Sequence, residues 1–125
     1  MNEDAQDIVI VADPIAPEEL KRLVLLHFGD MVKIVVDLER RVVAAGGELH
    51  ADAEQLLLQD GSRQSDLWGA NYFPGQDPEE CIQYTALINI RPTQANRGML
   101  IADPEIRRRV QEITFALIGR GEPLP

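Results

Sequence analysis

The hydrophobic pattern at the start of the chain predicts a strand followed by a helix. Residues 8–11 are the run Ile-Val-Ile-Val, whose β-branched side chains favour the extended backbone of a buried strand. Pro17 and the two glutamates after it are typical of a first helical turn, since acidic groups there face the positive end of the helix dipole. Apolar residues then recur at helical spacing up to Phe28, and Gly29 supplies the end of the helix.

Residues 31–45 fit two patterns. A helix would place the apolar residues on one stripe, whereas a strand would alternate them with polar residues such as Lys33. The many valines favour two strands joined by a tight turn near residues 39–41. The second strand runs into Gly46 and Gly47, and a glycine pair in a strand is typical of a bulge or a close approach of two backbones.

Three shorter features follow in the middle of the chain. Asp52 is placed to cap a short helix that ends at Asp60 and Gly61, and residues 67–73 have the composition of a strand. The cleanest alternation of the chain covers residues 81–91, which we expect to form a half-buried strand with one polar face.

The C-terminal part is predicted to be a long loop followed by a helix. Residues 92–102 have no periodicity, and a loop of that length without structure of its own is often functional. Asp103 and Pro104 suit an N-cap and a first helical position, and an apolar stripe continues from there to Leu117. We expect the last residues, 121–125, to be a frayed tail.

The predicted elements follow the order β-α-β-β-α-β-β-α. This order favours an α+β fold with a mainly antiparallel sheet and helices chiefly on one face. Its first six elements match the order of ferredoxin-like domains. A chain of 125 residues is long enough for one domain with a conventional core, which we place at residues 1–120.

Composition narrows the range of partners and compartments. The chain has 12 Lys and Arg against 21 Asp and Glu, a net charge of −9, and such a surface repels nucleic-acid phosphates. Cys81 is the only cysteine, so no internal disulfide forms, and no apolar run reaches the ~18 residues of a membrane span. The acidic N-terminus lacks the basic start of a signal peptide. We therefore expect a soluble cytoplasmic protein that binds neither nucleic acid nor membrane.

Glu48, His50, Asp52 and Glu54 stand at every second residue. In a strand they would share one face and could bind a metal or exchange protons. If Asp52 caps a helix, however, only Glu48 and His50 remain, which is fewer ligands than a structural zinc site uses. We therefore expect no metal and no cofactor, and we keep Glu48 and His50 as candidate catalytic residues.

Two further groups of residues are candidates for ligand binding. Trp68 and Asn71 lie with Gly69 on a predicted strand, where Trp68 either fills the core or faces a ligand. Arg91 ends the next predicted strand. The loop after it adds amide and guanidinium groups that either hold a carboxylate or phosphate or pair with acidic residues of the chain. The candidate residues are Trp68, Asn71, Arg91, Gln94, Asn96 and Arg97.

Three motifs carry a resemblance to a known family. They are GGELHAD at residues 46–52, DLWGAN at 66–71 and INIRPTQANR at 88–97. With these motifs the chain resembles, over nearly its whole length, a family of small bacterial and archaeal proteins catalogued as a domain of unknown function. The resemblance implies a single bacterial-type domain, and it implies no activity, cofactor or catalytic residue.

Two functional hypotheses remain. The first is a non-enzymatic binding or assembly module, a homodimer whose polar patch holds a small anionic group. Its dimer contact would use Phe115 and Ile118, which lie outside the apolar stripe of the last helix. The second is a small enzyme that acts on an anionic metabolite, with His50 as general base and with Arg91 and Arg97 as the anion clamp.

Overall fold

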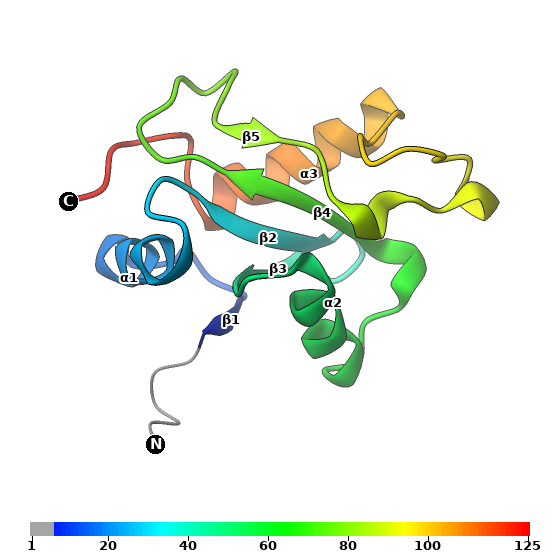
Figure 1. The fold of residues 1–125 in the computed structure, drawn as a ribbon, viewed down its shortest axis with the longest axis horizontal. Coiled ribbons are helices and arrows are strands. Elements are labelled where there is room, and N and C mark those ends of the chain that lie inside the picture. The colour runs from blue at the N-terminus through cyan, green and yellow to red at the C-terminus, as the bar shows by residue number, and fades with distance from the viewer. Residues whose placement is uncertain (1–6) are drawn as a thin grey trace.

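The computed structural model describes residues 7–125, which fold into one antiparallel sheet flanked by three α-helices (Figure 1). The strands are β1 (Ile8–Val11), β2 (Val32–Asp37), β3 (Val42–Gly46), β4 (Leu67–Tyr72) and β5 (Ile82–Gln83). The helices are α1 (Pro17–His27), α2 (His50–Gln59) and α3 (Pro104–Leu117), with short 3₁₀ turns η1 (Gln64–Asp66), η2 (Leu87–Asn89) and η3 (Pro92–Gln94). The α+β fold class is therefore confirmed. Residues 1–6, which belong to the predicted domain, lie outside the described part.

The sheet has the strand order β1-β3-β2-β4-β5, and each neighbouring pair is antiparallel. β2 and β3 form the predicted hairpin. Its turn is stabilised by Asp37, whose Oδ1 accepts hydrogen bonds from the backbone N–H groups of Glu39 and Arg40 at 2.9 and 2.8 Å. Two strands therefore account for residues 31–45, as the valine content indicated.

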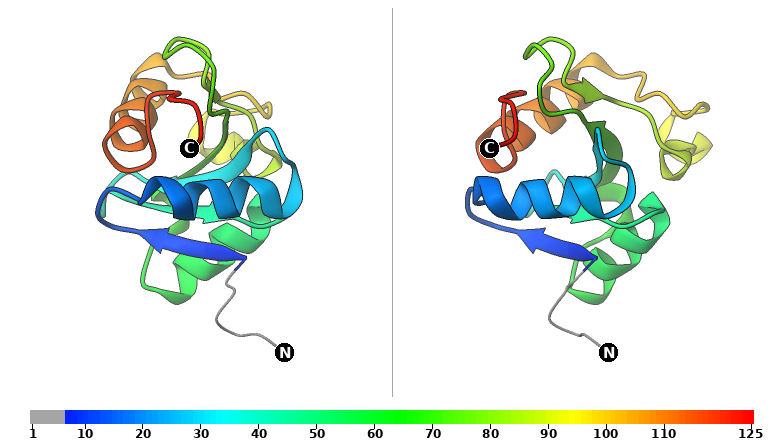
Figure 2. Two further views of the ribbon diagram at one scale, coloured as in Figure 1. Left: turned by 90° about the vertical axis from the view of Figure 1, so that its left-hand side faces the viewer. Right: turned by 60° about the vertical axis from the view of Figure 1, so that its left-hand side comes forward.

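The two faces of the sheet are covered by different helices (Figure 2). α1 and α3 pack on one face, where their residues Leu23 and Val110 join a core with Ile34 and Trp68. α2 packs on the other face, where Leu57 joins a smaller cluster with residues of β2, β3 and β4. Alternating side chains point to opposite faces of a strand, so strands buried on both sides are almost wholly apolar. Helices thus lie chiefly, but not only, on one face.

The first six elements follow the predicted ferredoxin-like order along the chain, but only the first three strands are arranged in the sheet as in that fold. β1, α1 and β2 form a split βαβ unit, with β3 between its two strands. In a ferredoxin-like sheet the strand after the second helix would lie beside β1, but here β4 pairs with β2. The chain after α2 returns to the end of β2, where Leu38 N–H donates to Asp66 O at 3.0 Å. β4 therefore enters at the open edge of β2.

The predicted start of the second helix is wrong by three residues, since the expected N-cap was Asp52 and the observed one is Leu49. α2 begins at His50, its N-cap is Leu49, and no side-chain hydrogen bond caps it. Asp52 is exposed within the first helical turn. At the third helix the prediction is confirmed, because Oδ1 of Asp103 accepts a hydrogen bond from the N–H of Glu105 at 2.8 Å.

The long strand expected over residues 81–91 is also wrong. It is shortened to β5, after which the chain turns through η2 and packs on the α2 side of β4. The packing is close at Gly69, where a Cβ atom would lie 2.6 Å from Cβ of Ala86. The alternation holds only as far as Ile88, where it belongs to a loop packed on the sheet rather than to a strand within it, and beyond it Asn89 is buried and Ile90 is exposed.

The C-terminal residues are packed against the body, in contrast to the frayed tail expected. Gly121 N–H donates to the hydroxyl oxygen of Tyr72 at 2.8 Å, and Gly121 O accepts from Gly75 N–H at 2.8 Å. Leu124 packs on the larger core. Within residues 7–125, no helix is long and apolar enough to span a membrane.

Candidate functional site

A cavity of about 420 Å³ opens on the α2 side of the sheet. Its floor is formed by strand residues, one wall by the start of α2, and the other wall by the loop that follows β5. The lining residues are Lys33, Leu49, His50, Ala51, Asn71, Gln83, Thr85, Ala86, Leu87, Ile88 and Met99. This volume lies in the range of small-molecule sites, which are mostly apolar with a few placed polar groups.

The floor is a row of polar side chains across three strands. Lys33 of β2 is opposite Asn71 of β4, and Asn71 is opposite Gln83 of β5. Directly opposed residues share one face of an antiparallel sheet, so the three side chains are neighbours. Asn71 Nδ2 donates to Gln83 Oε1 at 2.8 Å. The other amide atom, Asn71 Oδ1, is buried and has no hydrogen-bond partner of normal geometry among the described residues.

His50 stands at the edge of this floor, on the first turn of α2. Its Nε2 donates to the carbonyl oxygen of Ala70 at 2.8 Å, so the neutral ring carries its proton on Nε2 and a lone pair on Nδ1. Burial lowers the pKa of His50, and the charge of Lys33 lowers it further, while the hydrogen bond to Ala70 and the nearby amide of Asn71 oppose the change. The ring is therefore neutral at pH 7.

The charge of the cavity differs from that of the whole chain. Lys33 is the only Lys or Arg among the lining residues, and none of them is acidic. The ammonium group of Lys33 lies 5.2 Å from the centre of the Phe28 ring. It forms no ion pair with any carboxylate of residues 7–125. The positive end of the α2 dipole, which no side chain caps, adds to this local field.

The wall formed by the loop is held in place by two buried asparagines. Asn89 Oδ1 accepts from Gly69 N–H at 2.8 Å, and Asn89 Nδ2 donates to the carbonyl oxygens of Gly69 and Met99, both at 3.0 Å. The amide of Asn89 thus takes the place of a neighbouring strand at the edge of β4. Asn96 Nδ2 donates to Asn89 O at 2.7 Å, and Asn96 Oδ1 accepts from Ala102 N–H at 2.9 Å.

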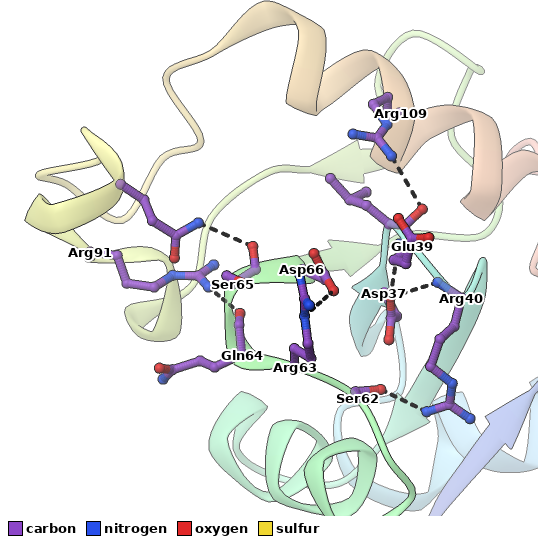
Figure 3. A network of polar contacts seen from close by, with 12 residues as sticks. Asp37, Glu39, Arg40, Ser62, Arg63, Gln64, Ser65, Asp66, Arg91 and Arg109 are labelled. Carbon is purple, nitrogen blue, oxygen red and sulfur yellow. Dashed lines mark hydrogen bonds and ion pairs between the residues drawn. The ribbon is translucent and has the colours of Figure 1, made fainter.

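Arg91 serves the same scaffold. Its guanidinium group donates to Gln64 O at 2.5 Å and also to Leu67 O (Figure 3 shows its approach to Gln64). The guanidinium carbon lies 4.1 Å from the centre of the Trp68 ring, a cation–π contact. Trp68 itself is buried in the larger core. Arg91 therefore anchors the loop to the start of β4.

The structure divides the residues predicted for the site into three groups. His50 and Asn71 line the cavity, whereas Trp68, Arg91, Gln94 and Asn96 make contacts within the chain, Gln94 through Nε2 to Ser65 O at 3.1 Å. Arg97 and Glu48 are exposed. Oε2 of Glu48 lies 3.9 Å from Nδ1 of His27, away from the row on the floor. No group of three or more His, Cys, Asp or Glu within residues 7–125 is arranged to hold a metal ion.

The sequence analysis missed Lys33 and Gln83 as members of the site. Both occupy polar positions of predicted strands, and Lys33 is one of only two lysines in the chain. The polar character of these two positions is visible in the sequence. Their place in the site depends on the strand order β2-β4-β5, which puts Lys33 and Gln83 on either side of Asn71.

Comparison with known proteins agrees with the resemblance carried by the three motifs. No curated protein and no solved structure matches the chain. A family model described as a protein of unknown function (DUF5674) matches residues 9–117, which run from the second residue of β1 to the last residue of α3. The chain therefore belongs to the DUF5674 family of proteins of unknown function.

Proposed function

We propose that this protein is a non-enzymatic binding module that holds a small molecule by an anionic group in the cavity between the floor of the sheet and α2. One observation carries the proposal. The chain has 21 acidic residues, yet none of those within residues 7–125 lines the cavity, and the one lysine that lines it has no carboxylate partner in that range. A half-buried lysine without such a partner favours an anion brought by a ligand.

The neighbours of Lys33 can support such an anion. Oxygen and nitrogen of an amide exchange places when the group turns over. If Asn71 and Gln83 both turn, their hydrogen bond is kept with Gln83 as donor, and Asn71 offers an N–H group to the cavity. The start of α2 adds backbone N–H groups and the positive end of its dipole.

Substitution of Lys33 tests the proposal. We expect the anionic apolar dye anilinonaphthalene sulfonate to bind the wild-type protein. Its affinity for Lys33→Met should be lower by a factor of about 10 or more. The reason is that a hydrogen bond to a charged group contributes about 1.5–3 kcal/mol, and 1.4 kcal/mol is a factor of ten in affinity. Dye fluorescence gives the affinity, and shifts of the Asn71 and Gln83 side-chain amides by NMR place the dye.

Lys21→Met is the matched control, since it removes the other lysine, which lies on α1 and does not line the cavity. It should bind the dye like the wild type. Equal affinities of Lys33→Met and Lys21→Met would contradict the proposal, as would dye shifts confined to the exposed apolar residues of α1.

A second candidate function is an enzyme with His50 as general base. It is favoured by the fixed orientation of the ring and by the neutral Nδ1, which a base requires at pH 7. Since Arg91 is bound to carbonyl oxygens, the anion partner of such an enzyme would be Lys33. Hydrolysis of para-nitrophenyl acetate that disappears in His50→Gln would favour this function, whereas the binding module predicts no turnover by the wild-type protein.

Self-association belongs to the proposal, but it needs a surface other than α3. Ile118 is buried, and Phe115 packs on the core of its own chain. The alternative surface consists of three exposed apolar residues, namely Leu25 and Leu26 of α1 and Phe28, which directly follows α1. Sedimentation at micromolar concentration tests the point, and a species of 14.0 kDa would remove self-association from the proposal.

A further inference from the structure

Large apolar side chains gather at the mouth of the cavity. Leu49, Leu87 and Met99 all line it and are 60, 70 and 41% exposed. Leu100, which is 56% exposed, is paired with the lining residue Thr85 by an isolated bridge. Exposed leucines are common singly, but an apolar rim around a concave site marks a surface that a ligand covers.

The cavity therefore changes from polar to apolar between its floor and its mouth. The floor presents Lys33, Asn71 and Gln83 in one row, whereas the mouth presents Leu49 and Leu87 to solvent. No Phe, Tyr or Trp lines it, so it offers flexible aliphatic contacts rather than an aromatic face on which a planar ring would stack. A ligand that satisfies both ends is amphipathic.

The charge of the floor limits the head group of this ligand. It supplies one full positive charge, at Lys33, while the partial positive charge at the start of α2 is offset by the carboxylate of Asp52 in the first turn of that helix. One negative charge is balanced by this set, whereas a phosphate monoester near pH 7 brings about −1.5 to −2. A buried charge without compensation is costly, so the match favours a single carboxylate.

We infer that the cavity binds an aliphatic monocarboxylate, with the carboxylate at Lys33 and Asn71 and the hydrocarbon chain running out between Leu49, Leu87 and Met99. This inference rests on the proposed function and names its ligand class. Each methylene that enters the apolar part of the cavity contributes about 0.8 kcal/mol, or roughly a fourfold gain in affinity. The gain ends where the chain passes the mouth.

Competition with anilinonaphthalene sulfonate tests the ligand class on the intact chain. Butanoate, hexanoate and octanoate should displace the dye with affinities that rise about 15-fold for each two methylenes. Octylamine and octyl phosphate have the same chain with a different head group, and both should bind at least ten times more weakly than octanoate. Tighter binding of octyl phosphate, or affinities independent of chain length, would overturn the inference.

Leu87→Ser tests the path of the ligand's hydrocarbon chain through the cavity. Because Leu87 is exposed, the substitution should leave the fold intact. It should weaken octanoate about 10-fold and leave butanoate unchanged, because only the longer chain reaches the mouth. Leu25→Ser, at a similarly exposed leucine on α1, should change neither affinity. If Lys33-dependent dye binding is present but octanoate does not compete, the inference fails and the proposed function stands. If the dye does not bind at all, both fail.

Discussion

At the scale of single residues, His50 combines a structural and a chemical role. Its Nε2 is bound to Ala70 O of β4, and its ring lines the cavity. The hydrogen bond to this carbonyl fixes the orientation of the buried imidazole ring, and the ring is uncharged. Such a ring suits either a ligand contact or a base. Asn71 contributes in a similar way, because one amide atom binds Gln83 while the other lies near the His50 ring without a hydrogen bond of normal geometry within residues 7–125.

The lowered pKa of His50 predicts how stability depends on pH. The unfolded chain takes up a proton at this residue near its ordinary pKa of about 6.5, whereas the folded chain takes it up only at lower pH. Between these two pKa values the unfolded state binds more protons, so the free energy of unfolding falls as pH is lowered and is restored above about pH 7. Urea unfolding between about pH 5 and 7.5 measures this.

His50→Gln removes the titrating group and supplies the comparison. The difference in unfolding free energy between wild type and His50→Gln should change across this pH range, while contributions from His27 and the carboxylates are shared by both proteins and cancel. A difference that stays constant with pH would contradict the placement of His50 as a buried neutral ring.

At the scale of elements, β4 organises the site. It pairs with β2 and β5, its carbonyl at Ala70 orients α2, and its outer edge is bound by the side chains of the loop. Asn89 is the main connection, since it satisfies both backbone groups of Gly69 and also Met99 O. An interior amide that binds three backbone groups is part of the framework, and its loss is expensive because both backbone groups of Gly69 lose this partner together.

Asn89→Ala should therefore destabilise the protein strongly. The change leaves the N–H and C=O of Gly69 without that partner, and each unsatisfied buried group costs about 1–3 kcal/mol, whereas Met99 O keeps its hydrogen bond from Ala86 N–H. We expect a loss on the order of 3 kcal/mol in urea unfolding, with hydrogen exchange of the loop amides accelerated. Gln94→Ala is the control, since its single bond to Ser65 O is exposed, and a loss as large as that of Asn89→Ala would refute this assignment.

At the scale of the whole molecule, the C-terminal tail completes the larger core. After α3 the chain turns back so that Gly121 bonds both Tyr72 of β4 and Gly75 of the following loop. Burial raises the pKa of Tyr72 to about 12, although the hydrogen bond from Gly121 acts in the opposite direction, and a raised pKa is expected for a phenol that stays neutral inside the fold. The tail thus links the last helix to the central sheet.

Deletion of residues 121–125 tests this link. The shortened chain loses the two hydrogen bonds of Gly121 and the packing of Leu124, which together amount to about 2–4 kcal/mol. We expect a lower midpoint of thermal unfolding and no change in the fold by circular dichroism. Removal of Pro125 alone, an exposed residue, should have no effect, and an unchanged midpoint for the longer deletion would mean that the tail is frayed as its composition indicates.

The elements that depend on local pattern were predicted from the sequence. The β-branched run of β1, the helix after Pro17, the valine-rich hairpin and the capped α3 each follow from interactions between residues close in the chain. His50 and Asn71 were also named in advance, because a histidine after a glycine pair and an amide beside a strand glycine are visible as chemistry.

Only the tertiary structure decided what these residues face. The strand order brings Lys33 and Gln83 beside Asn71, and the loop across β4 turns Asn89 and Arg91 into backbone supports rather than parts of a ligand site. Sequence pattern records which face of an element is buried, because burial acts on each residue through its own hydrophobicity. It does not record which strands become neighbours, because that choice depends on contacts between segments far apart in the chain.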